Sequence, residues 1–300
     1  DAQESRGLGD VYKRQVKYFG EEQLESNSFT YRLKTILDNV MYLMKHIMEE
    51  LSQSEFFVAD CELKIGEDIP SYTIVLPDGH KIAVCGSVDR VDIMQRANIT
   101  YLRIIDYKTG TKQFKLSDIL YGINLQMLLY LHSIEASGGD KYGEIVPAGI
   151  LYMPATVPYI SSDSLKSIDK LPDELNKKLK MNGLLLKDTE IIHGMDKTDV
   201  ATYIPVKIKA GEPVSSTSLA TLAEFGKIFK KVDMLIAEMG KNIYNGNIEA
   251  KPLKGGHDSC EYCPYDSVCA YRQSNPITCF SVDNKTVIEE ITNEINRKEE

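Results

Sequence analysis

The hydrophobic pattern along the chain begins with a long amphipathic helix. Between residues 30 and 52, apolar side chains recur at spacings of three and four, as they do on one face of a helix. Three segments rich in branched apolar residues follow at 56–66, 80–94 and 99–110, and each predicts a β-strand. Gly86 permits a bulge or bend within the second of them. A hairpin at residues 95–98 would make the second and third strands an antiparallel pair.

The rest of the chain alternates helical and extended patterns. We expect a helix over residues 117–134 that places Gly122, Gln126 and Tyr130 on one stripe. A buried strand over 146–154 comes next, followed by a loop-rich region in which KLKMNGLLL predicts a helix running into a strand. A second long helix is expected over 219–245, and after residue 280 a short helix or a frayed tail. The order helix, three strands, helix, strand indicates an α/β fold.

Composition narrows the class of protein. The chain has 300 residues, 43% of them hydrophobic, which is enough for one large domain or two smaller ones. No apolar run approaches the roughly 20 residues of a membrane span, so we expect no membrane partner. Residues 1–15 lack the apolar core of a secretory signal and begin with Asp rather than Met. They resemble stray, non-native sequence, and we expect the chain to be a fragment.

The charge and the cysteines bear on the partner and the compartment. A formal net charge of −9 argues against a free-standing protein that holds nucleic acid by a broadly basic surface, but not against catalysis on nucleic acid. The local basic residues Lys177, Lys178 and Lys180 indicate either a solvated helix face or a nucleic-acid contact. Six cysteines in a chain of this length do not suit a small disulfide scaffold, so a reduced, cytoplasmic compartment is expected.

Charged residues interrupt two of the predicted strands in a pattern that fits a metal site. GSVDRVD places Asp89 on one strand, and IIDYKTG places Asp106 and Lys108 on the next. Carboxylates on facing strands can share a cation, and residues two apart on a strand share a face. Mg²⁺ or Mn²⁺ would accept these oxygens together with the backbone carbonyl of Tyr107, and would keep several waters. The alternative is a pair of strand ends whose charges are simply solvated.

A second constellation lies near the end of the chain. Cys260, Cys263 and Cys269 form a C-x₂-C-x₅-C run. Closely spaced cysteines in a reduced protein favour a thiolate-bound metal, either zinc or an iron–sulfur cluster. Cys279 and His257 are the local candidates for a fourth ligand, and either would suit zinc. Unpaired, buried structural cysteines are the alternative.

These motifs together carry a family resemblance. GSVDRVD, IIDYKTG and the following LQMLLYL resemble the PD-(D/E)XK motif of RecB-type nucleases, with its downstream Gln-x-x-x-Tyr helix. The resemblance implies that Asp89 and Asp106 hold the metal and that Lys108 is the catalytic lysine. It also implies that Gln126 and Tyr130 line the site.

The same resemblance implies a fold and a domain plan. The fold is a restriction-endonuclease-like α/β core, a central mixed sheet flanked by helices, with a C-terminal cysteine-cluster segment. Glu62, on the preceding strand, is a candidate for the family's additional acid, or else an edge-strand surface acid. We expect the nuclease domain over residues 27–280, with an inserted region at 155–245 and the cysteine cluster at 257–280. Residues 281–300 would be a polar tail.

With EYCPYDSVCAYR added, the chain resembles the iron–sulfur nuclease domain of AddB-type subunits of bacterial helicase–nucleases. In that family three C-terminal cysteines and one distant cysteine hold a four-iron (4Fe-4S) cluster. No cysteine precedes Cys61 here, so we expect the distant ligand to be missing.

The resemblance implies a Mg²⁺-dependent DNA exonuclease that processes double-strand breaks for recombinational repair. Its partners would be DNA and an AddA-like helicase–nuclease subunit. One alternative is a catalytically silent, nuclease-like module that binds DNA ends or the helicase partner, and the joint retention of Asp89, Asp106 and Lys108 counts against it. Another is a Cas4-like or Dna2-like iron–sulfur exonuclease, but the long region between residues 155 and 245 favours the AddB type.

Overall fold

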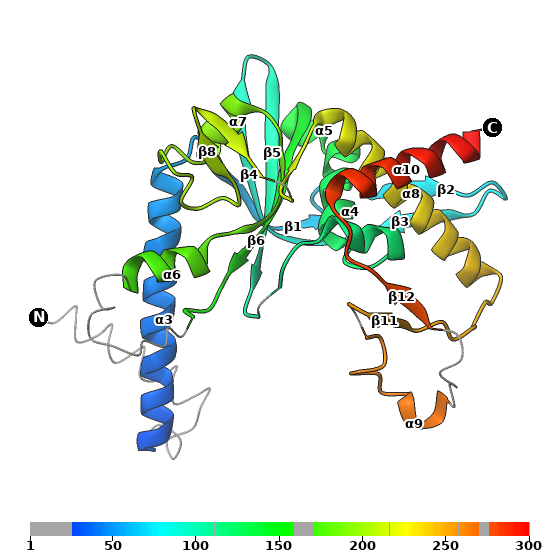
Figure 1. Cartoon of the computed structure of the whole chain (residues 1–300), viewed down its shortest axis with the longest axis horizontal. Coiled ribbons are helices and arrows are strands. Elements are labelled where there is room, and N and C mark those ends of the chain that lie inside the picture. The colour runs from blue at the N-terminus through cyan, green and yellow to red at the C-terminus, as the bar shows by residue number, and fades with distance from the viewer. Residues whose placement is uncertain are drawn as a thin grey trace, which may run out of the picture. The chain divides into compact units, whose positions relative to one another are not determined.

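A computed structural model describes residues 26–110, 112–158, 171–215, 217–256, 258–269 and 276–299 (Figure 1). The predicted leader at 1–15 lies outside these ranges. The chain divides into two compact units, residues 1–49 and residues 50–300. After Ser26, the described part of the first unit belongs to helix α3 (Asn27–Ser52), which confirms the first predicted helix. The second unit holds the sheet and the candidate site.

A six-stranded mixed sheet organises the second unit (Figure 1). Its strands lie in the order β1, β4, β5, β6, β7, β10. β1 with β4, β4 with β5 and β6 with β7 are antiparallel, whereas β5 with β6 and β7 with β10 are parallel. The predicted mixed sheet and antiparallel pair are therefore confirmed. The bounds are β1 Phe57–Ile65, β4 Gly86–Arg96, β5 Ile99–Lys108, β6 Glu144–Pro154, β7 Asn182–Leu186 and β10 Leu219–Ala220.

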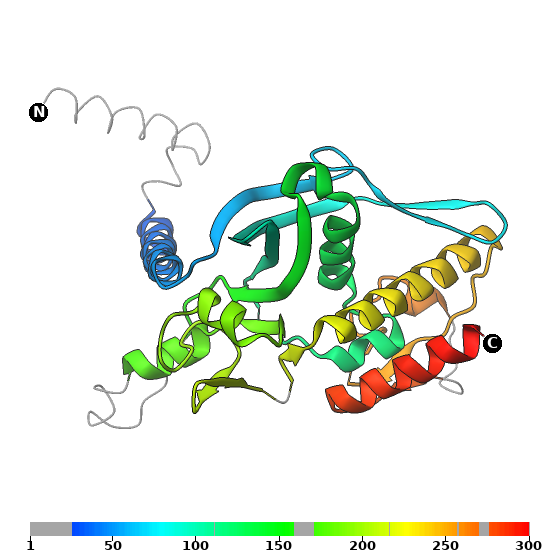
Figure 2. The same cartoon turned by 90° about the horizontal axis from the view of Figure 1, so that it is seen from above.

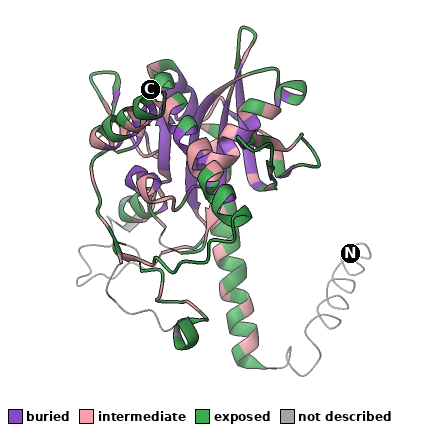
Figure 3. Cartoon of the chain, turned by 90° about the vertical axis from the view of Figure 1, so that its right-hand side faces the viewer, coloured by how far each residue is buried: buried purple, intermediate pink, exposed green. Residues whose placement is uncertain are grey.

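The centre of the sheet is buried on both faces. Consecutive residues of β5 such as Ile104 and Ile105 are fully buried, and so are Ile150 and Leu151 of β6. In Figure 3 the central strands are coloured as buried along most of their length. Strands covered on both faces carry continuous apolar runs rather than alternating ones. A charged residue at the end of such a strand is therefore exceptional, which is why IIDYKTG stands out.

Three helices form successive layers beside the sheet. α4 (Gln126–Ser137) packs against β5 and β6, α8 (Leu222–Tyr244) packs against α4, and α10 (Asn284–Glu299) packs against α8 (Figure 2). Val287, Ile291 and Ile295 of α10 are buried at helical spacing. Of the two structures expected after residue 280, the chain forms the helix. No helix in the described ranges is long and apolar enough to cross a membrane.

The remaining elements are short. The helices are η1 Leu116–Tyr121, a 3₁₀ helix, α5 Gly139–Tyr142, α6 Leu171–Leu179, α7 Thr189–Met195 and α9 Asp266–Cys269. The two-stranded sheets pair β2 Tyr72–Val75 with β3 Lys81–Val84, β8 Lys207–Lys209 with β9 Glu212–Val214, and β11 Leu253–Gly255 with β12 Ile277–Cys279. α6 followed by β7 confirms the predicted helix running into a strand.

Two predicted elements are divided in the structure. The strand expected over residues 80–94 is interrupted at Cys85, which separates β3, part of a hairpin with β2, from β4. The helix expected over 117–134 is also interrupted, because η1 ends at Gly122 in the left-handed conformation (φ 69°) and α4 begins only at Gln126. Gly122 therefore does not share a helical stripe with Gln126 and Tyr130, and that prediction is wrong.

His132 of α4 joins the helical layers to the β2–β3 hairpin. Its Nε2 lies 3.2 Å from both Tyr72 Oη and Asp233 Oδ2, and its ring stacks on Phe229 with centroids 4.6 Å apart. Burial alone would lower the pKa of His132. The carboxylates of Asp233 and Glu135 have the larger, opposite effect, and the pKa is raised to about 9. The folded protein therefore binds this proton more tightly than an unfolded chain with an ordinary histidine pKa of about 6.5.

The raised pKa of His132 predicts how the free energy of unfolding changes with pH. Its stabilising contribution is fully present below about pH 6.5 and is lost as the pH rises towards about 9, because the raised pKa belongs to the folded state. With allowance for solvent screening of a half-buried group, we expect wild type to lose about 2 kcal/mol of unfolding free energy over that interval. His132→Phe should lose less, as measured by urea unfolding at both ends of the interval. Parallel pH profiles of the two proteins would contradict this assignment.

Candidate active site

The register of the sheet brings the predicted acids together. Backbone pairing of β4 with β5 ends at Arg90 and Ile105, so Asp89 and Asp106 occupy the next positions outward on the two strands. Positions opposite each other across a sheet point to the same face. Lys108 shares that face because it lies two residues beyond Asp106. The structure thus places the predicted acids and the predicted catalytic lysine on one face of the sheet.

Asp89 and Asp106 have different neighbours. Asp89 Oδ2 accepts a hydrogen bond from the backbone N–H of Tyr107 at 2.8 Å. Asp106 is only 8% exposed, and its Oδ2 forms an ion pair with Lys108 Nζ. That oxygen accepts no hydrogen bond of ordinary geometry from the described residues. A carboxylate has about four lone-pair sites, so Asp106 can accept a cation in addition to Lys108.

Gln126 and Tyr130 of α4 lie beside the start of β4. Gln126 Nε2 donates to Tyr130 Oη at 3.4 Å, so the two side chains act as a pair. A Cβ atom built on Gly86 would lie only 2.2 Å from Tyr130 Oη. The tyrosine therefore rests directly on the β4 backbone, three residues before Asp89. The role of the helix pair in lining the site stays a prediction.

Glu62 belongs to the same row, meaning the line of paired positions that runs across neighbouring strands of the sheet. The register of β1 with β4 sets it opposite Asp89. Its backbone adopts the left-handed conformation (φ 53°), which is uncommon for a residue with a side chain. Its carboxylate accepts a hydrogen bond from Ser87 Oγ at 3.2 Å. Glu62 is thus near the candidate site but bound to a neighbouring hydroxyl.

The donor atoms at the site suit a hard divalent cation. Within the described ranges, no group of three or more Asp, Glu, His or Cys side chains is arranged to hold a metal. Asp89 and Asp106 are therefore a two-carboxylate set, and Tyr107, which follows Asp106 in the chain, donates its backbone N–H to Asp89. Mg²⁺ is commonly held by one or two carboxylates while it keeps several waters, so the residues present fit such an ion.

Two polar residues that the sequence analysis did not select continue the row. Tyr152 of β6 is paired with Asp106, and Asn182 of β7 is paired with Tyr152. Tyr152 is 3% exposed, yet its hydroxyl has no hydrogen-bond partner among the described residues. Burial and the nearby charge of Asp106 raise the pKa of Tyr152 to about 12, so its hydroxyl stays protonated. A tyrosine inside an apolar strand motif was the only sequence signal for this position.

The opposite face of the same strands carries a buried charge cluster. Arg90 donates to both carboxylate oxygens of Asp92, at 2.9 and 2.7 Å, and to Glu50 at 3.0 Å. Arg103 donates to Asp92 at 3.0 Å and to Glu50 at 2.6 Å. Burial alone would lower the pKa of Arg90, but Asp92 and Glu50 raise it above its ordinary value. Arg90 also donates to the hydroxyl of Tyr107, which connects the cluster to the residue between Asp106 and Lys108.

The sequence analysis missed this cluster, although it left a signal. Arg90 and Asp92 stand two residues apart in an otherwise apolar strand, and Arg103 occupies the matching place on the next strand. Alternating opposite charges on paired buried strands indicate an internal ion-pair network. The distant partner Glu50, near the end of the amphipathic helix α3, has no such local signal.

The cysteines do not form a metal centre in the structure. Cys260, Cys263 and Cys269 are free, the first two half-buried and the third exposed, and Cys279 ends β12. No group of three metal-binding side chains is found in the described ranges. His257 lies outside them. A metal bound by these cysteines therefore stays a prediction.

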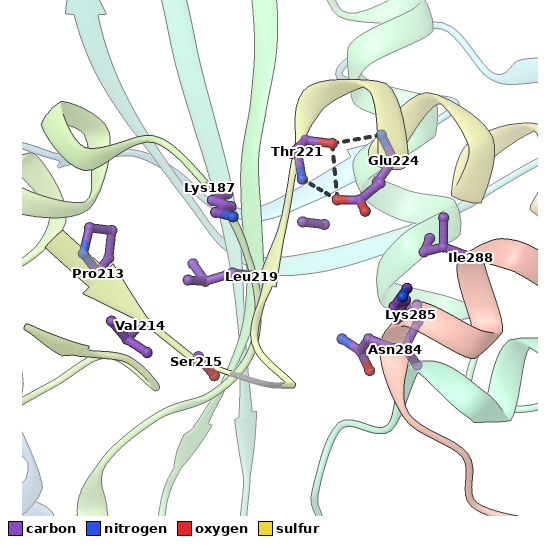
Figure 4. A pocket seen from close by; sticks show the side chains of 12 residues that line it. Lys187, Pro213, Val214, Ser215, Leu219, Thr221, Glu224, Asn284, Lys285 and Ile288 are labelled. Carbon is purple, nitrogen blue, oxygen red and sulfur yellow. Dashed lines mark hydrogen bonds between the residues drawn. The ribbon is translucent and has the colours of Figure 1, made fainter.

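A separate pocket lies beside the start of α8 (Figure 4). Thr221 caps the helix, its Oγ1 accepting from the backbone N–H of Glu224 at 3.3 Å, while the Glu224 carboxylate accepts from the Thr221 N–H at 2.7 Å. Lys187 and Lys285 share the lining with Glu224, so the charge of this pocket is mixed. It contains none of the predicted catalytic residues.

Comparison with known proteins agrees with the geometry of the site. The family model of the PD-(D/E)XK nuclease superfamily matches residues 8–270 of the chain. The B subunit of an ATP-dependent helicase/deoxyribonuclease from a Thermoanaerobacter species is 38% identical over 246 residues, which cover 80% of this chain and 21% of that protein.

Proteins with the same name from other bacteria are similar over most of the chain. The one from Alkaliphilus oremlandii is 33% identical over an alignment 313 residues long, which covers 95% of this chain and 27% of that protein. The one from Clostridium kluyveri is 36% identical over 278 residues, covering 90% and 24%. The chain thus spans about a quarter of the length of these relatives. The extent of the family match, together with paired acids and a lysine at the end of a mixed sheet, means that the chain belongs to the PD-(D/E)XK nuclease superfamily.

Proposed function

We propose that the chain is the nuclease domain of a helicase–nuclease subunit and hydrolyses phosphodiesters of unwound DNA with Mg²⁺, or with Mn²⁺ in its place. The observation that carries the proposal is the placement of Asp89, Asp106 and Lys108 on one face of β4 and β5. In the helicase/deoxyribonuclease relatives, the remaining length leaves room for a motor region. The partners would be DNA and an AddA-like subunit, and the role would be to process double-strand breaks for recombinational repair.

The residues of the chain have distinct parts in this reaction. Asp89 and Asp106 hold the cation, and the Tyr107 N–H keeps the Asp89 carboxylate in place. A bound Mg²⁺ supplies Lewis acidity and a more acidic water. Lys108 is already at Asp106, and its ammonium can donate to a phosphate oxygen or orient the attacking water as charge develops. Tyr130 and Gln126, which bond each other on α4, would line the site from that helix.

The test is a nuclease assay of the full chain against its Asp106→Asn variant, with Mg²⁺ and with EDTA. Cleavage that needs the metal and the carboxylate supports a nuclease. DNA binding without cleavage under all conditions supports the silent binding module instead.

We further propose Cys260, Cys263 and Cys269 as ligands of a four-iron cluster that pins the C-terminal segment, with zinc as the alternative. Their spacing supports this proposal. The purified chain is expected to contain iron and acid-labile sulfide and to absorb visible light. Cys263→Ser should remove most of the iron and most of the sulfide. Colourless protein with stoichiometric zinc would refute the cluster, and protein without bound metal would refute both alternatives.

A further inference from the structure

Two adjoining pockets extend from the candidate active site. The first has a volume of ≈ 790 Å³ and is lined by Lys108, Lys112, Lys177 and Lys178 among others. The second, of ≈ 580 Å³, includes residues of the β8–β9 region. Lys177 and Lys180 line both pockets, so the two lie side by side. One end of this hollow is therefore the lysine that pairs with Asp106.

The lining of the two pockets is basic in an acidic chain. Lys207 and Lys209 of β8 add to the lysines already described, and no Asp or Glu of the described residues lines either pocket. The chain as a whole has a net charge of −9, so such a gathering does not follow from composition. The lysines come from β5 and the loop after it, from α6 and its end, and from β8. We call Lys108, Lys112, Lys177, Lys178, Lys207 and Lys209 the lysine path.

One lysine of the pocket lining supports the fold, and two others lie over a tyrosine ring. Lys180 Nζ donates to the carbonyl oxygens of Ala201 and Val206, at 2.6 and 2.9 Å, and so has a structural role. Lys108 and Lys112 both lie over the ring of Tyr152, with Nζ 5.7 and 5.1 Å from its centroid. Burial and the charge of Lys108 lower the pKa of Lys112, and an anion between the two would relieve their repulsion.

An aromatic residue accompanies the charges. Phe114 is half-buried and lines the first pocket. Asn182, the last residue of the polar row, fixes the loop that carries it: Asn182 Oδ1 accepts from the Phe114 N–H at 2.7 Å, and Nδ2 donates to the Lys112 carbonyl at 3.0 Å. A basic groove with an aromatic platform is typical of sites for single-stranded nucleic acid, where lysines follow phosphates and a ring stacks on a base.

We propose that the lysine path binds the backbone phosphates of a single DNA strand on one side of the scissile bond, leading it from Asp106 across β7 towards β8, with a base on Phe114. The inference rests on the proposed function for the identity of the ligand. Single-stranded DNA is favoured over duplex because the lining is concave and of limited volume, whereas a duplex is a wide convex rod.

The test measures binding without cleavage. A fluorescent oligothymidylate of about 12 nucleotides is titrated in EDTA, at several salt concentrations, with the full chain carrying Asp106→Asn. Lys207→Ala with Lys209→Ala removes two phosphate contacts, so the slope of log K against log salt should become shallower by about 1.4. Affinity should fall roughly tenfold at moderate salt. Phe114→Leu should weaken binding and leave the salt slope unchanged.

The matched control removes the same charge elsewhere. Lys241→Ala with Lys285→Ala takes two exposed lysines from α8 and α10 and should leave both affinity and slope unchanged. Equal losses in the two double variants would reduce the effect to net charge and overturn the proposal, as would unchanged binding by Lys207→Ala with Lys209→Ala. A blunt duplex of the same length that binds more tightly than the single strand would overturn the choice of ligand.

The two proposals fail in different ways. Because binding is measured without metal, an inactive wild type that still binds through these lysines would refute the nuclease and leave the lysine path standing. Metal-dependent cleavage by wild type, with unaltered DNA binding by the lysine variants, would support the nuclease and refute the lysine path.

Discussion

Asp106→Asn is expected to lower Mg²⁺-dependent cleavage of single-stranded DNA by about a thousandfold, or about 4 kcal/mol of transition-state stabilisation. The amide has the shape of the carboxylate but not its charge, so the cation loses a ligand and Lys108 loses its partner. The Lys108 side chain is 28% exposed, so water can solvate its ammonium, and the amide keeps the volume of the carboxylate, so the change costs the fold little. The measurement is the initial rate of product release from an end-labelled oligonucleotide at saturating Mg²⁺.

Asp140→Asn is the matched control for this prediction. Asp140 is an exposed acid on α5, so the same chemical change there should leave the rate within about twofold of wild type. Circular dichroism spectra of both variants check that the fold is retained. If Asp106→Asn cleaves at the wild-type rate, Asp106 does not hold the catalytic metal and the proposed mechanism is wrong.

Arg103→Met is expected to reduce the free energy of unfolding by about 3–5 kcal/mol. Arg103 is fully buried and shares Asp92 and Glu50 with Arg90, so the cluster holds two positive and two negative side chains. Methionine fills much of the space but leaves two buried carboxylates with one guanidinium, and an unpaired buried charge is strongly unfavourable. The urea midpoint and slope measure the loss.

Two further variants make this prediction specific. Arg96→Met removes an arginine from an exposed ion pair with Glu55, where the side chain is 43% exposed, so a loss below about 1 kcal/mol is expected. Arg103→Lys keeps the charge without the planar fork that binds two acids at once, and should fall between the other two variants. A loss below about 1 kcal/mol for Arg103→Met would show that the cluster does not hold β4 and β5 together.

The pairing of the two candidate acids could be predicted from sequence because its signal is local. Asp89 and Asp106 lie on consecutive strands joined by a short turn, so strand pattern and register alone place them on one face. Gln126 and Tyr130 were placed through family resemblance, and the structure adds the contact of Tyr130 with the β4 backbone. Gly122 was wrongly added to their stripe, because helical spacing continues through a glycine that in fact ends a 3₁₀ helix.

The rest depended on contacts between distant parts of the chain. Tyr152 is paired with Asp106 because β5 and β6 are parallel neighbours, and Asn182 is paired with Tyr152 because β6 and β7 are antiparallel neighbours. A local sequence pattern predicts neither strand pairing. Lys177, Lys178 and Lys180 looked like either a solvated helix face or a nucleic-acid contact. Only the fold brings Lys177, Lys178 and Lys108 to the lining of one pocket and assigns Lys180 to two backbone carbonyls. The cysteine ligands could not be tested by pattern, since spacing does not determine where side chains converge.

The close approach of Tyr130 to Gly86 limits which sequences can support the site. Any side chain at position 86 would have to displace the tyrosine or move α4 away from β4. A variant with a larger residue there could lose activity although every acid and lysine remained in place. In a mutational scan, such a position would look like a catalytic residue while never touching the substrate.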